Sequence, residues 1–577
     1  METNLRVAAL LAEIADLLEL EGAEGFKAVA YRRAARNIQA LDGEVAALKA
    51  GGKLQDIPGV GPGLAGKIGE LLEAGTCKVL EELRGKVPAG LREVLEVPGI
   101  GTRTAAMLYR EAGIASLAEL EAAARAGRLQ ALPRLGEKQE GQILTAIARL
   151  RQRAGRFPLG AVLPYGEALA RFLAGVSGVT AAAVAGSVRR RVDMVKDLDL
   201  VAGTTDPQGL VKAFSSHPLV AEVLACGTAR CSVRLAAGFS ADLRVVSPPE
   251  FYAALHHFTG SKEHHVRLRH LAKARGLTLS EYGAMSADGG RTVPPDEAAV
   301  YALVGLSWVP PELREDQGEI EAAAAGTLPE LVSLGQVRGD LHVHTDWSDG
   351  IDTLERMARA ARELGYEYLA ICDHARALGF TRGLDAEKLS RQGAEIDRLN
   401  AALAGITLLK GVEANIMADG SLDLADEVLA GLDVVVAAVH SGLADGVRVT
   451  ERLSAAIRHP LVHIIAHPTG RILGRRDGTD IDLPRVLDEA ARGGKVLEIN
   501  AHPDRLDLPS PPARQWLDRG GLLAVDTDAH AAVALADMGW GIDVARRAWA
   551  SSAGILNALP LSELRQRLAH IRRCSRQ

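Results

Sequence analysis

Nine histidine and carboxylate side chains in the C-terminal part of the chain occur in short motifs of strand length. The first motif is Gly339-Asp340-Leu341-His342-Val343-His344-Thr345, and the last is Asp526-Thr527-Asp528-Ala529-His530. Because side chains two residues apart point to the same face of a β-strand, each motif can offer two ligands to one ion. The nine residues are His342, His344, Asp349, His374, Glu413, His440, His467, Asp528 and His530. This pattern predicts a site for several metal ions.

Most of these residues follow an apolar run, as in 368–372 before His374 and 434–439 before His440. This order is typical of a barrel of alternating strands and helices, which gathers polar side chains at one rim. A single histidine at a strand end is more often structural than a ligand, but nine such residues in barrel order favour a metal site. The mixed imidazole and carboxylate set suits Zn²⁺, Mn²⁺ or Fe²⁺ better than Mg²⁺ or Ca²⁺, which prefer oxygen ligands.

The order His-x-His, Asp, His, Glu, His, His and Asp-x-His resembles the PHP (polymerase and histidinol phosphatase) family over about residues 336–577. The resemblance implies a distorted (β/α)7 barrel in which these positions bind up to three ions, Mn²⁺ or Zn²⁺. Such a cluster can produce a metal-bound hydroxide near neutral pH and bind a phosphate on its opposite side. The implied chemistry is hydrolysis of a phosphoester.

A chain of 577 residues is too long for one hydrophobic core, so several domains are expected. The net charge of -6 argues against a uniformly basic surface, and basic runs such as 188–191 indicate local binding of nucleic acid. The five cysteines form no CxxC pair and no disulfide-rich spacing, which is typical of a reducing cytoplasm. No apolar run approaches the ~20 residues that span a bilayer. We therefore expect a cytoplasmic, nucleoid-associated protein with no membrane partner.

The N-terminal region contains a repeat, Ile57-Pro58-Gly59-Val60-Gly61-Pro62 and Val97-Pro98-Gly99-Ile100-Gly101-Thr102, and residues 3–20 have helical periodicity. Both copies resemble helix-hairpin-helix motifs, and 131–136 is a candidate third, degraded copy. Glycine permits the tight hairpin, and the amides that begin the next helix can bind a DNA phosphate without reading bases. Gly59, Gly61, Gly99 and Gly101 are therefore predicted to contact DNA.

A second carboxylate pattern, Asp197-Leu198-Asp199, follows Gly186-Ser187 and precedes Asp242 on another alternating run. Asp197 and Asp199 share a strand face, and Asp242 can join them from a neighbouring strand. Three carboxylates hold two Mg²⁺ or Mn²⁺ ions for nucleotidyl transfer, and Asp242 can accept the proton of a 3′-hydroxyl. The alternative, a solvated Asp-x-Asp turn, does not account for the preceding Gly-Ser or the third aspartate.

The run 251–262, which ends Phe258-Thr259-Gly260-Ser261-Lys262, resembles the nucleotide-binding thumb of X-family DNA polymerases. The likeness extends over about residues 1–318, so the whole chain resembles the bacterial branch of that family, a polymerase core fused to a PHP domain. His257, His265 and Lys196 stand where the family usually has tyrosine, asparagine and glycine. The resemblance implies a nucleotide-binding set of Gly186, Ser187, Arg190, His257, Phe258, Gly260, Ser261, Lys262 and His265.

Lys67 occupies the position of a lysine that forms a Schiff base in family members with 5′-deoxyribose-phosphate lyase activity. Lys27 and Tyr31 match supporting DNA-binding positions, although Gly63 replaces a second family lysine. A lysine among cations loses basicity and becomes nucleophilic, which makes a catalytic role physically sound. The alternative is that Lys67 only contacts a phosphate.

The resulting prediction is a multidomain α and α+β protein. Its parts are an 8-kDa-like helical domain with the first hairpin (1–85), a fingers-like helical domain with the second hairpin (86–155), a nucleotidyltransferase palm with a mixed or antiparallel sheet (156–247), an α/β thumb (248–318), a linker (319–335) and the PHP barrel (336–577).

The predicted function is a monomeric gap-filling DNA polymerase that uses dNTPs on gapped or primer-template DNA, with a 3′–5′ exonuclease in the PHP domain. Two alternatives remain at this point. One is a PHP-type phosphoesterase for small phosphomonoesters, and the other is a DNA-end-binding repair scaffold with a weak polymerase core. The paired hairpins favour a polymeric substrate, although association of folds is only an analogy.

Overall fold

The computed structural model describes residues 2–22, 25–39, 41, 44–95, 97, 100–133, 135–153, 155–376 and 383–574. They form two compact units, Met1–Ala154 and Gly155–Gln577. Among the described residues, no helix combines the length and the apolarity needed to traverse a lipid bilayer.

The N-terminal unit is helical and is organised around its first helix, α1 (Glu2–Glu21), which confirms the helix predicted over 3–20. Leu11 and Ile14 of α1 are fully buried, because apolar residues at this spacing share one face of a helix. The other elements are α2 (Gly25–Gln39), α3 (Val45–Ala50), η1 (Leu54–Asp56), α4 (Pro62–Ala74), α5 (Lys78–Lys86), α6 (Gly90–Leu95), α7 (Thr102–Ala112), α8 (Leu117–Arg125), η2 (Arg128–Ala131) and α9 (Glu137–Arg153).

The palm is a five-stranded mixed sheet in the order β2-β4-β7-β6-β5, in which β4 and β7 are parallel and the other pairs are antiparallel. Its core includes Leu198, Leu200 and Phe214, all fully buried. The elements are β1 (Phe157–Pro158), α10 (Leu159–Ala174), β2 (Val179–Val184), α11 (Gly186–Arg189), β3 (Met194–Val195), β4 (Asp197–Thr204), α12 (Pro207–Ser215), β5 (Val220–Cys226), β6 (Arg230–Leu235) and β7 (Ser240–Val246).

The thumb consists of short helices and a three-stranded antiparallel sheet. Its last helix, α16 (Glu319–Ala325), lies in the range predicted as a linker, and Ile320 and Ala323 are buried in the thumb core. The preceding elements are η3 (Pro248–Glu250), α13 (Phe251–Thr259), α14 (Lys262–Ala274), β8 (Leu277–Ser280), β9 (Gly283–Ser286), β10 (Arg291–Thr292), α15 (Glu297–Leu303) and η4 (Pro311–Leu313).

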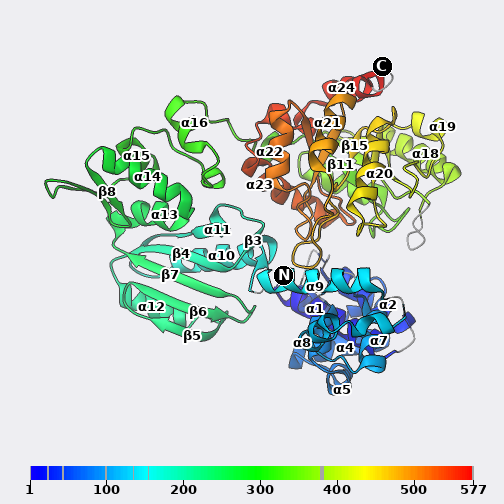
Figure 1. Cartoon of the computed structure of the whole chain (residues 1–577), viewed down its shortest axis with the longest axis horizontal. Helices are drawn as coiled ribbons and strands as arrows, with labels where there is room; N and C mark the ends of the chain where they lie inside the picture. The colour runs from blue at the N-terminus through cyan, green and yellow to red at the C-terminus, as the bar shows by residue number, and fades with distance from the viewer. Residues whose placement is uncertain are drawn as a thin grey trace. The chain divides into compact units, whose positions relative to one another are not determined.

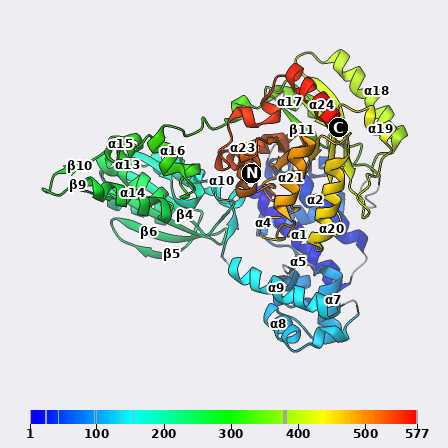
Figure 2. The same ribbon diagram turned by 45° about the horizontal axis from the view of Figure 1, so that its top comes forward.

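The C-terminal part is a barrel of seven parallel strands, ordered in the sheet as they are in the chain and covered by helices (Figures 1 and 2). The first strand meets the last, since Val343 pairs in parallel with Ala529. Strands such as β14 are buried on both faces, which is why they read as continuous apolar runs. The strands are β11 (Gly339–Val343), β12 (Tyr368–Ile371), β13 (Thr407–Asn415), β14 (Val434–Ala438), β15 (Ile464–Ile465), β16 (Val496–Asn500) and β17 (Leu522–Asp526).

The helices of this barrel begin and end where the chain carries the expected signals. Helix α21, for example, begins after Asp482, whose side chain accepts from Arg485 N, and ends at Gly494 in the left-handed region. The helical elements are η5 (Leu334–Gln336), α17 (Leu354–Glu363), α18 (Ala386–Ala402), α19 (Asp426–Ala430), α20 (Gly446–Arg458), α21 (Leu483–Gly493), α22 (Ser510–Asp518), η6 (Ala532–Asp537), α23 (Met538–Arg547), η7 (Ser552–Gly554), η8 (Leu556–Ala558) and α24 (Leu561–Cys574). The predicted fold class is confirmed.

The cysteines, whose spacing is not disulfide-rich, nevertheless include one bonded pair, since Cys226 and Cys231 form a disulfide. The two residues are register partners at the end of the β5–β6 hairpin, with Cα atoms 4.0 Å apart. Pairing across a hairpin depends on strand register, and the spacing of cysteines along a chain does not reveal register.

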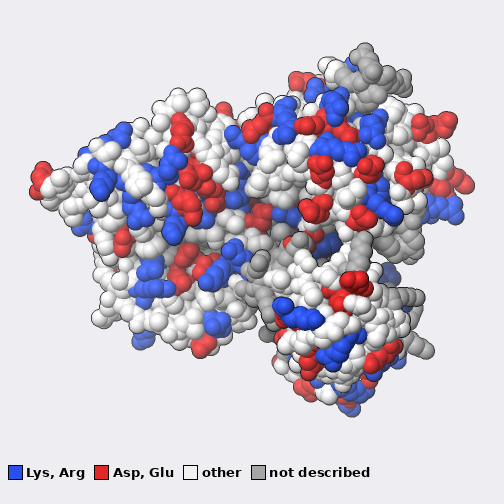
Figure 3. Space-filling model, in the orientation of Figure 1, with Lys and Arg blue, Asp and Glu red and all other residues white. Residues whose placement is uncertain are grey.

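Acidic and basic side chains are interspersed over the face of the molecule drawn in Figure 3. This agrees with the weakly negative net charge of -6 and with local rather than general attraction of polyanions.

A buried charge cluster joins the palm to the thumb. Glu297 accepts two hydrogen bonds from Arg189, at 2.9 and 2.6 Å, and one from Arg314 at 2.8 Å. Arg314 is fully buried. Burial opposes the charge of Glu297, yet the two guanidinium groups hold the pKa of its carboxyl below the usual value.

We expect Glu297→Ala to lower the free energy of unfolding of the thumb by about 3–5 kcal/mol, because it leaves the buried Arg314 without its carboxylate. Denaturant titration followed by hydrogen exchange of thumb amides measures this. Glu321→Ala, which removes one of the two carboxylate partners of the largely exposed Arg267, is the control and should change the stability little. Equal losses of stability in the two variants would contradict the stabilising role assigned to the buried carboxylate of Glu297.

Candidate metal centres

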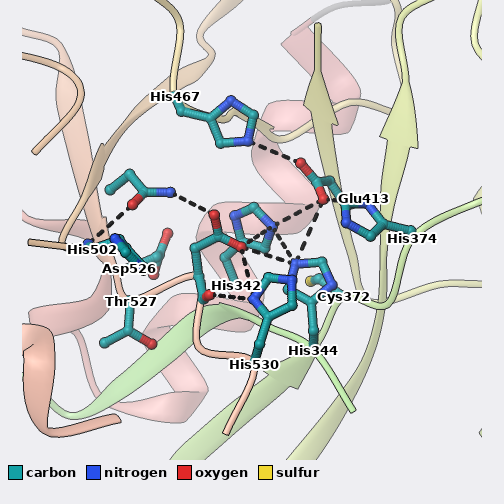
Figure 4. A network of polar contacts seen from close by, with 12 residues as sticks. His342, His344, Cys372, His374, Glu413, His467, His502, Asp526, Thr527 and His530 are labelled. Atoms are coloured by element: carbon teal, nitrogen blue, oxygen red, sulfur yellow. Dashed lines mark hydrogen bonds and ion pairs between the residues drawn. The ribbon is translucent and has the colours of Figure 1, made fainter. Parts of the chain in front are cut away.

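The carboxyl ends of the barrel strands bring all nine predicted ligands to one rim, and Figure 4 labels His342, His344, His374, Glu413, His467 and His530 among them. His342 lies in β11 and His344 directly after it, while Glu413 lies in β13. The other ligands follow β12, β14, β15 and β17, and Asp349 lies in the loop after β11. Parallel strands direct their carboxyl ends to the same edge, so residues up to about 190 positions apart meet here.

Glu413 lies at the centre of the rim and its side chain is almost fully buried. Its oxygens lie 2.7 Å from His374 Nδ1 and 3.1 Å from Nε2 of both His440 and His467. A carboxylate shared among several imidazoles is the arrangement expected of a bridging ligand between metal ions.

The donors fall into three groups whose ligand atoms all lie within 4.8 Å of one another. The groups are His344, Asp349, His374 and His530; His342, His344 and Glu413; and His374, Glu413 and His440. Asp528 joins them, since its Oδ1 lies 3.0 Å from His344 Nε2. Three overlapping groups fit the predicted cluster of up to three ions.

Hydrogen bonds outside the rim orient the imidazoles. His342 Nδ1 lies 2.6 Å from Glu498 Oε1, and His440 Nδ1 lies 2.7 Å from Asn415 Oδ1. Because an acceptor on Nδ1 places the proton there, the Nε2 lone pair of each ring points into the site. This is the tautomer that a metal ligand needs.

The charges within the rim also fit metal ions. His342 Nε2 and His344 Nε2 lie 3.1 Å apart, and His344 Nδ1, His467 Nδ1 and Glu413 Oε2 are buried without a hydrogen-bond partner among the described residues. Burial lowers the pKa of His344 to about 3, so its ring is neutral at pH 7. Burial raises the pKa of Glu413, but neighbouring histidines hold it well below the usual value. Burial opposes the charge of His374, but Glu413 and Asp349 raise its pKa to about 10, which shows that the carboxylates of the rim attract positive charge, as a site for divalent cations requires.

The palm brings the three predicted aspartates together on one face of its sheet. Asp199 of β4 is the register partner of Asp242 of β7, and Asp197 lies two residues before Asp199. Leu198 and Leu200 point to the opposite, buried face. Burial, and then the charges of Asp197 and Asp242, raise the pKa of Asp199 to about 7. Such repulsion between carboxylates is relieved when they share divalent cations.

Gly186 makes close approach to this site feasible. It has a φ of +60°, and a Cβ at this position would lie 2.1 Å from Asp199 Oδ2. Only glycine therefore fits beside the aspartates. Ser187 follows it in α11, and Arg190 is the residue directly after that helix.

Polar partners hold two of these residues in specific positions. Asp242 Oδ1 accepts from Arg230 Nη2 at 2.8 Å and from the hydroxyl of Ser232. Arg190 donates to Thr259 O at 2.5 Å and to Glu315 Oε1 at 3.1 Å. Arg190 thus lies at the junction of palm and thumb. A triphosphate would have to compete with Glu315 for the hydrogen bonds of its guanidinium group.

The predicted thumb residues lie at the α13–α14 junction. Phe258 stacks under Arg244 at 4.9 Å, Ser261 caps α14, and Lys262 is exposed at the first turn of that helix. The rings of His257 and His265 lie 5.4 Å apart. Burial lowers the pKa of both, that of His265 to about 3, so both are neutral hydrogen-bonding groups at pH 7.

In the N-terminal unit, Gly59 and Gly61 form the turn before α4, and Gly101 is the residue before α7. Lys67 Nζ lies 5.8 Å from the ring of Tyr31 and 3.2 Å from Gly63 O. Lys27 is exposed on α2. Gly99 lies outside the described residues.

Several residues of these sites were not identified from the sequence, namely Glu498, Asn415, Asn500, Arg230 and Ser232. Glu498 and Asn500 end the apolar run of β16, so the strand-end rule that found the nine ligands could have found them. Arg230 and Ser232 carry no such signal, because they reach Asp242 only through the β6–β7 pairing.

Models of known families match most of the chain. They are a helix-hairpin-helix domain at residues 2–77, a SAM-like helix-hairpin-helix tandem at 91–149, a DNA polymerase beta thumb at 254–315 and a PHP domain at 340–502.

Curated proteins are similar to the whole chain or to its parts. The chain is 38% identical to the DNA polymerase/3'-5' exonuclease PolX of Bacillus subtilis, over 97% of this chain and 98% of that protein. It is 27% identical to rat DNA polymerase lambda over 54% of this chain and 56% of that protein. It is 34% identical to a probable phosphatase of Caldanaerobacter subterraneus over 28% of this chain and 61% of that protein.

We expect Glu498→Gln to weaken Mn²⁺ binding at the rim by roughly 10–100-fold, because a neutral amide is a weaker acceptor for the proton on His342 Nδ1 than a carboxylate is. Equilibrium dialysis with elemental analysis measures the loss. Glu355→Gln, an exposed change on α17, is the matched control and should keep the affinity unchanged. Wild-type affinity in Glu498→Gln would contradict a role for this carboxylate.

Proposed function

The chain belongs to the family of the bacterial DNA polymerase/3'-5' exonuclease PolX, and from this membership and its two metal centres we propose that it is a DNA-directed DNA polymerase with a 3′–5′ exonuclease. The observation that carries the proposal is the presence of both centres in one chain, three aspartates on the palm sheet and nine ligands at the barrel rim. The proposed role is filling of gaps during DNA repair in the cytoplasm, at the nucleoid, by a monomer.

The palm is the proposed synthesis site. Asp197, Asp199 and Asp242 would hold two Mg²⁺ or Mn²⁺ ions, which neutralise charge on the triphosphate and lower the pKa of the primer 3′-hydroxyl. Asp242 accepts the proton of that hydroxyl. Gly186 leaves room for the triphosphate beside Asp199.

Palm and thumb residues would bind the incoming dNTP. Ser187 and Arg190 donate to its phosphates, and Lys262 adds a positive charge from the start of α14. His257 and His265 contact the sugar and base as neutral rings, while Phe258, Gly260 and Ser261 form the turn between the two helices.

The barrel rim is the proposed hydrolysis site, where the nine ligands would hold up to three Mn²⁺ or Zn²⁺ ions. Such ions would supply a hydroxide and stabilise the charge that develops in phosphoester hydrolysis. Glu498 and Asn415 fix the tautomers of His342 and His440. Hydrolysis at this rim removes the 3′ nucleotide of a DNA strand.

The N-terminal unit would bind the DNA backbone on gapped or primer-template substrates. Gly59 and Gly61, and by the sequence repeat Gly99 and Gly101, would belong to the two hairpins, and the helix N-termini that follow would face phosphates. The division into an 8-kDa-like domain (1–85), fingers (86–155), palm (156–247), thumb (248–318), linker (319–335) and PHP domain (336–577) belongs to the same proposal.

A lyase activity at Lys67 is a second candidate function, favoured by one observation. Lys67 lies over the ring of Tyr31, whose pKa burial raises to about 12, so the phenol stays neutral beside the amine. Lys67 would attack the C1′ carbon of a 5′-deoxyribose phosphate and form a Schiff base, and Lys27 would contact the phosphate.

Two other functions would use the same fold. A phosphatase for small phosphomonoesters needs only the rim, and a DNA-end scaffold needs only the hairpins. The intact carboxylate and histidine sets argue against the scaffold. Hydrolysis of a small phosphate ester, compared with that of a labelled primer, separates the phosphatase from the exonuclease.

A crossed experiment tests the two activities on gapped DNA. Asp242→Ala should reduce nucleotide insertion by about 10³-fold or more, because it removes a metal ligand, and should keep Mn²⁺-dependent degradation. His344→Ala should do the reverse. Primer extension and 3′-end degradation are measured for both variants, so each is the other's control. Insertion by Asp242→Ala at the wild-type rate would place synthesis elsewhere, and unchanged degradation by His344→Ala would place hydrolysis elsewhere.

For the lyase, we expect borohydride to trap the protein on DNA that carries a 5′-deoxyribose phosphate, and Lys67→Arg to abolish trapping, because a guanidinium keeps the charge but is not a nucleophile. Gel electrophoresis measures the covalent complex. Lys78→Arg, an exposed lysine, is the control and should be trapped normally. Trapping of Lys67→Arg like the wild type would remove the lyase function.

A further inference from the structure

The end of β16 and the residues that follow it lie against the metal rim, although none of the nine ligands belongs to them. Asn500 Nδ2 donates to Asp528 Oδ2 at 3.0 Å, and Arg505 Nε lies 3.8 Å from the same oxygen. About a quarter of the Arg505 side chain is exposed. Arg505 therefore places a partly accessible guanidinium beside a ligand of the proposed metal cluster, where a substrate phosphate would lie.

The residue after Arg505 has a strained backbone conformation. Leu506 has a φ of +48°, in the left-handed region that non-glycine residues rarely occupy. The surrounding structure must hold such a residue in place. We call residues 502–507 the rim segment.

Arg471 holds the rim segment through hydrogen bonds to its backbone carbonyl groups and to Asp507. Its Nε donates to Arg505 O at 2.8 Å and its Nη2 donates to Leu506 O. Its backbone N donates to Asp507 Oδ2 at 3.3 Å. One guanidinium thus fixes the two consecutive carbonyl groups that border the strained residue.

The orientation of Arg471 is set in turn by the palm. Its Nη2 also donates to Asp193 Oδ2 at 2.8 Å, and only 13% of the Arg471 side chain and 19% of that of Asp193 are exposed. The backbone carbonyl of Asp193 accepts from Leu159 N at 2.9 Å, which ties this part of the palm to α10. The same face of the palm contacts the rim segment again, since a Cβ on Gly160 would lie 2.9 Å from Pro503 Cβ.

We propose that the polymerase half of the chain supplies a positioning residue to the exonuclease. Asp193 of the palm holds Arg471, Arg471 holds the rim segment, and the rim segment presents Arg505 to a phosphate of the DNA end at the metal centre. A guanidinium suits this task because it can donate two parallel hydrogen bonds to phosphate oxygens. The inference rests on the proposed 3′–5′ exonuclease.

The first test compares two palm–barrel ion pairs of similar burial. Asp193→Asn should raise the KM for Mn²⁺-dependent degradation of a labelled primer about tenfold while kcat changes less, because substrate binding and not the metal set is affected. Asp543→Asn, which breaks the Arg191–Asp543 pair at 3.2 Å and leaves the Asp193–Arg471 pair in place, should keep KM within about twofold. Asp193→Glu, which keeps the charge, should recover part of the loss. Both neutral variants should extend primers and keep the wild-type metal content by elemental analysis.

The second test asks whether Asp193 acts through Arg505. Arg505→Ala should raise KM by itself, and Asp193→Asn added to it should cause little further change, since coupled residues are not additive. Arg471→Lys, which keeps the charge but not the planar fork that reaches both carbonyl groups, should resemble Asp193→Asn and serves if the latter does not fold.

Wild-type KM in both Asp193→Asn and Arg471→Lys, additive losses with Arg505→Ala, or loss of metal from Asp193→Asn would each overturn the inference. Absence of Mn²⁺-dependent degradation by the wild-type protein would instead overturn the proposed exonuclease itself, so the two failures are distinguishable.

Discussion

Parallel β-strands align their equivalent ends at the same edge of a sheet, and both metal centres of this protein are built at such an edge. In the palm, β4 and β7 are the parallel pair, and their register places Asp199 directly opposite Asp242. In the barrel, all seven strands are parallel, and their carboxyl ends gather ligands from β11 to β17. The short local motifs become sites only because this pairing brings them together.

Placing so many ligand groups close together is electrostatically unfavourable, and the two sites reduce this repulsion in different ways. The barrel combines three carboxylates, Asp349, Glu413 and Asp528, with six imidazoles, and acceptors such as Glu498 and Asn415 direct the lone pairs of His342 and His440 inward. The palm places three carboxylates side by side, so the pKa of Asp199 rises to about 7. An imidazole-rich set suits Mn²⁺ or Zn²⁺, whereas an all-oxygen set suits Mg²⁺. The proposed assignment of synthesis to the palm and of hydrolysis to the barrel therefore agrees with the ligand types of the two sites.

The polymerase core and the barrel are not independent bodies within the unit that contains them. Arg191 pairs with Asp543, Arg471 pairs with Asp193, and Arg547 donates at 2.6 Å to the carbonyl of Arg190. These contacts reach segments next to both candidate centres, because Asp193 precedes Asp197 in the chain and Arg190 follows the Gly-Ser turn. Partly buried ion pairs of this kind specify one docking geometry, even where their net contribution to stability is small.

The sequence by itself determined the fold class, the strand-end ligands, the three aspartates and the two hairpins, because each depends on short-range patterns: a period of two in strands, glycine at tight turns, and apolar runs that end in polar residues. Only the tertiary structure decided that Glu498 orients His342, that Arg230 and Ser232 hold Asp242, that Cys226 joins Cys231, and that Asp193 reaches Arg471 across 278 residues. A polar side chain has no local signature of its distant partner, since that partner is chosen by strand register and by the docking of one domain on another.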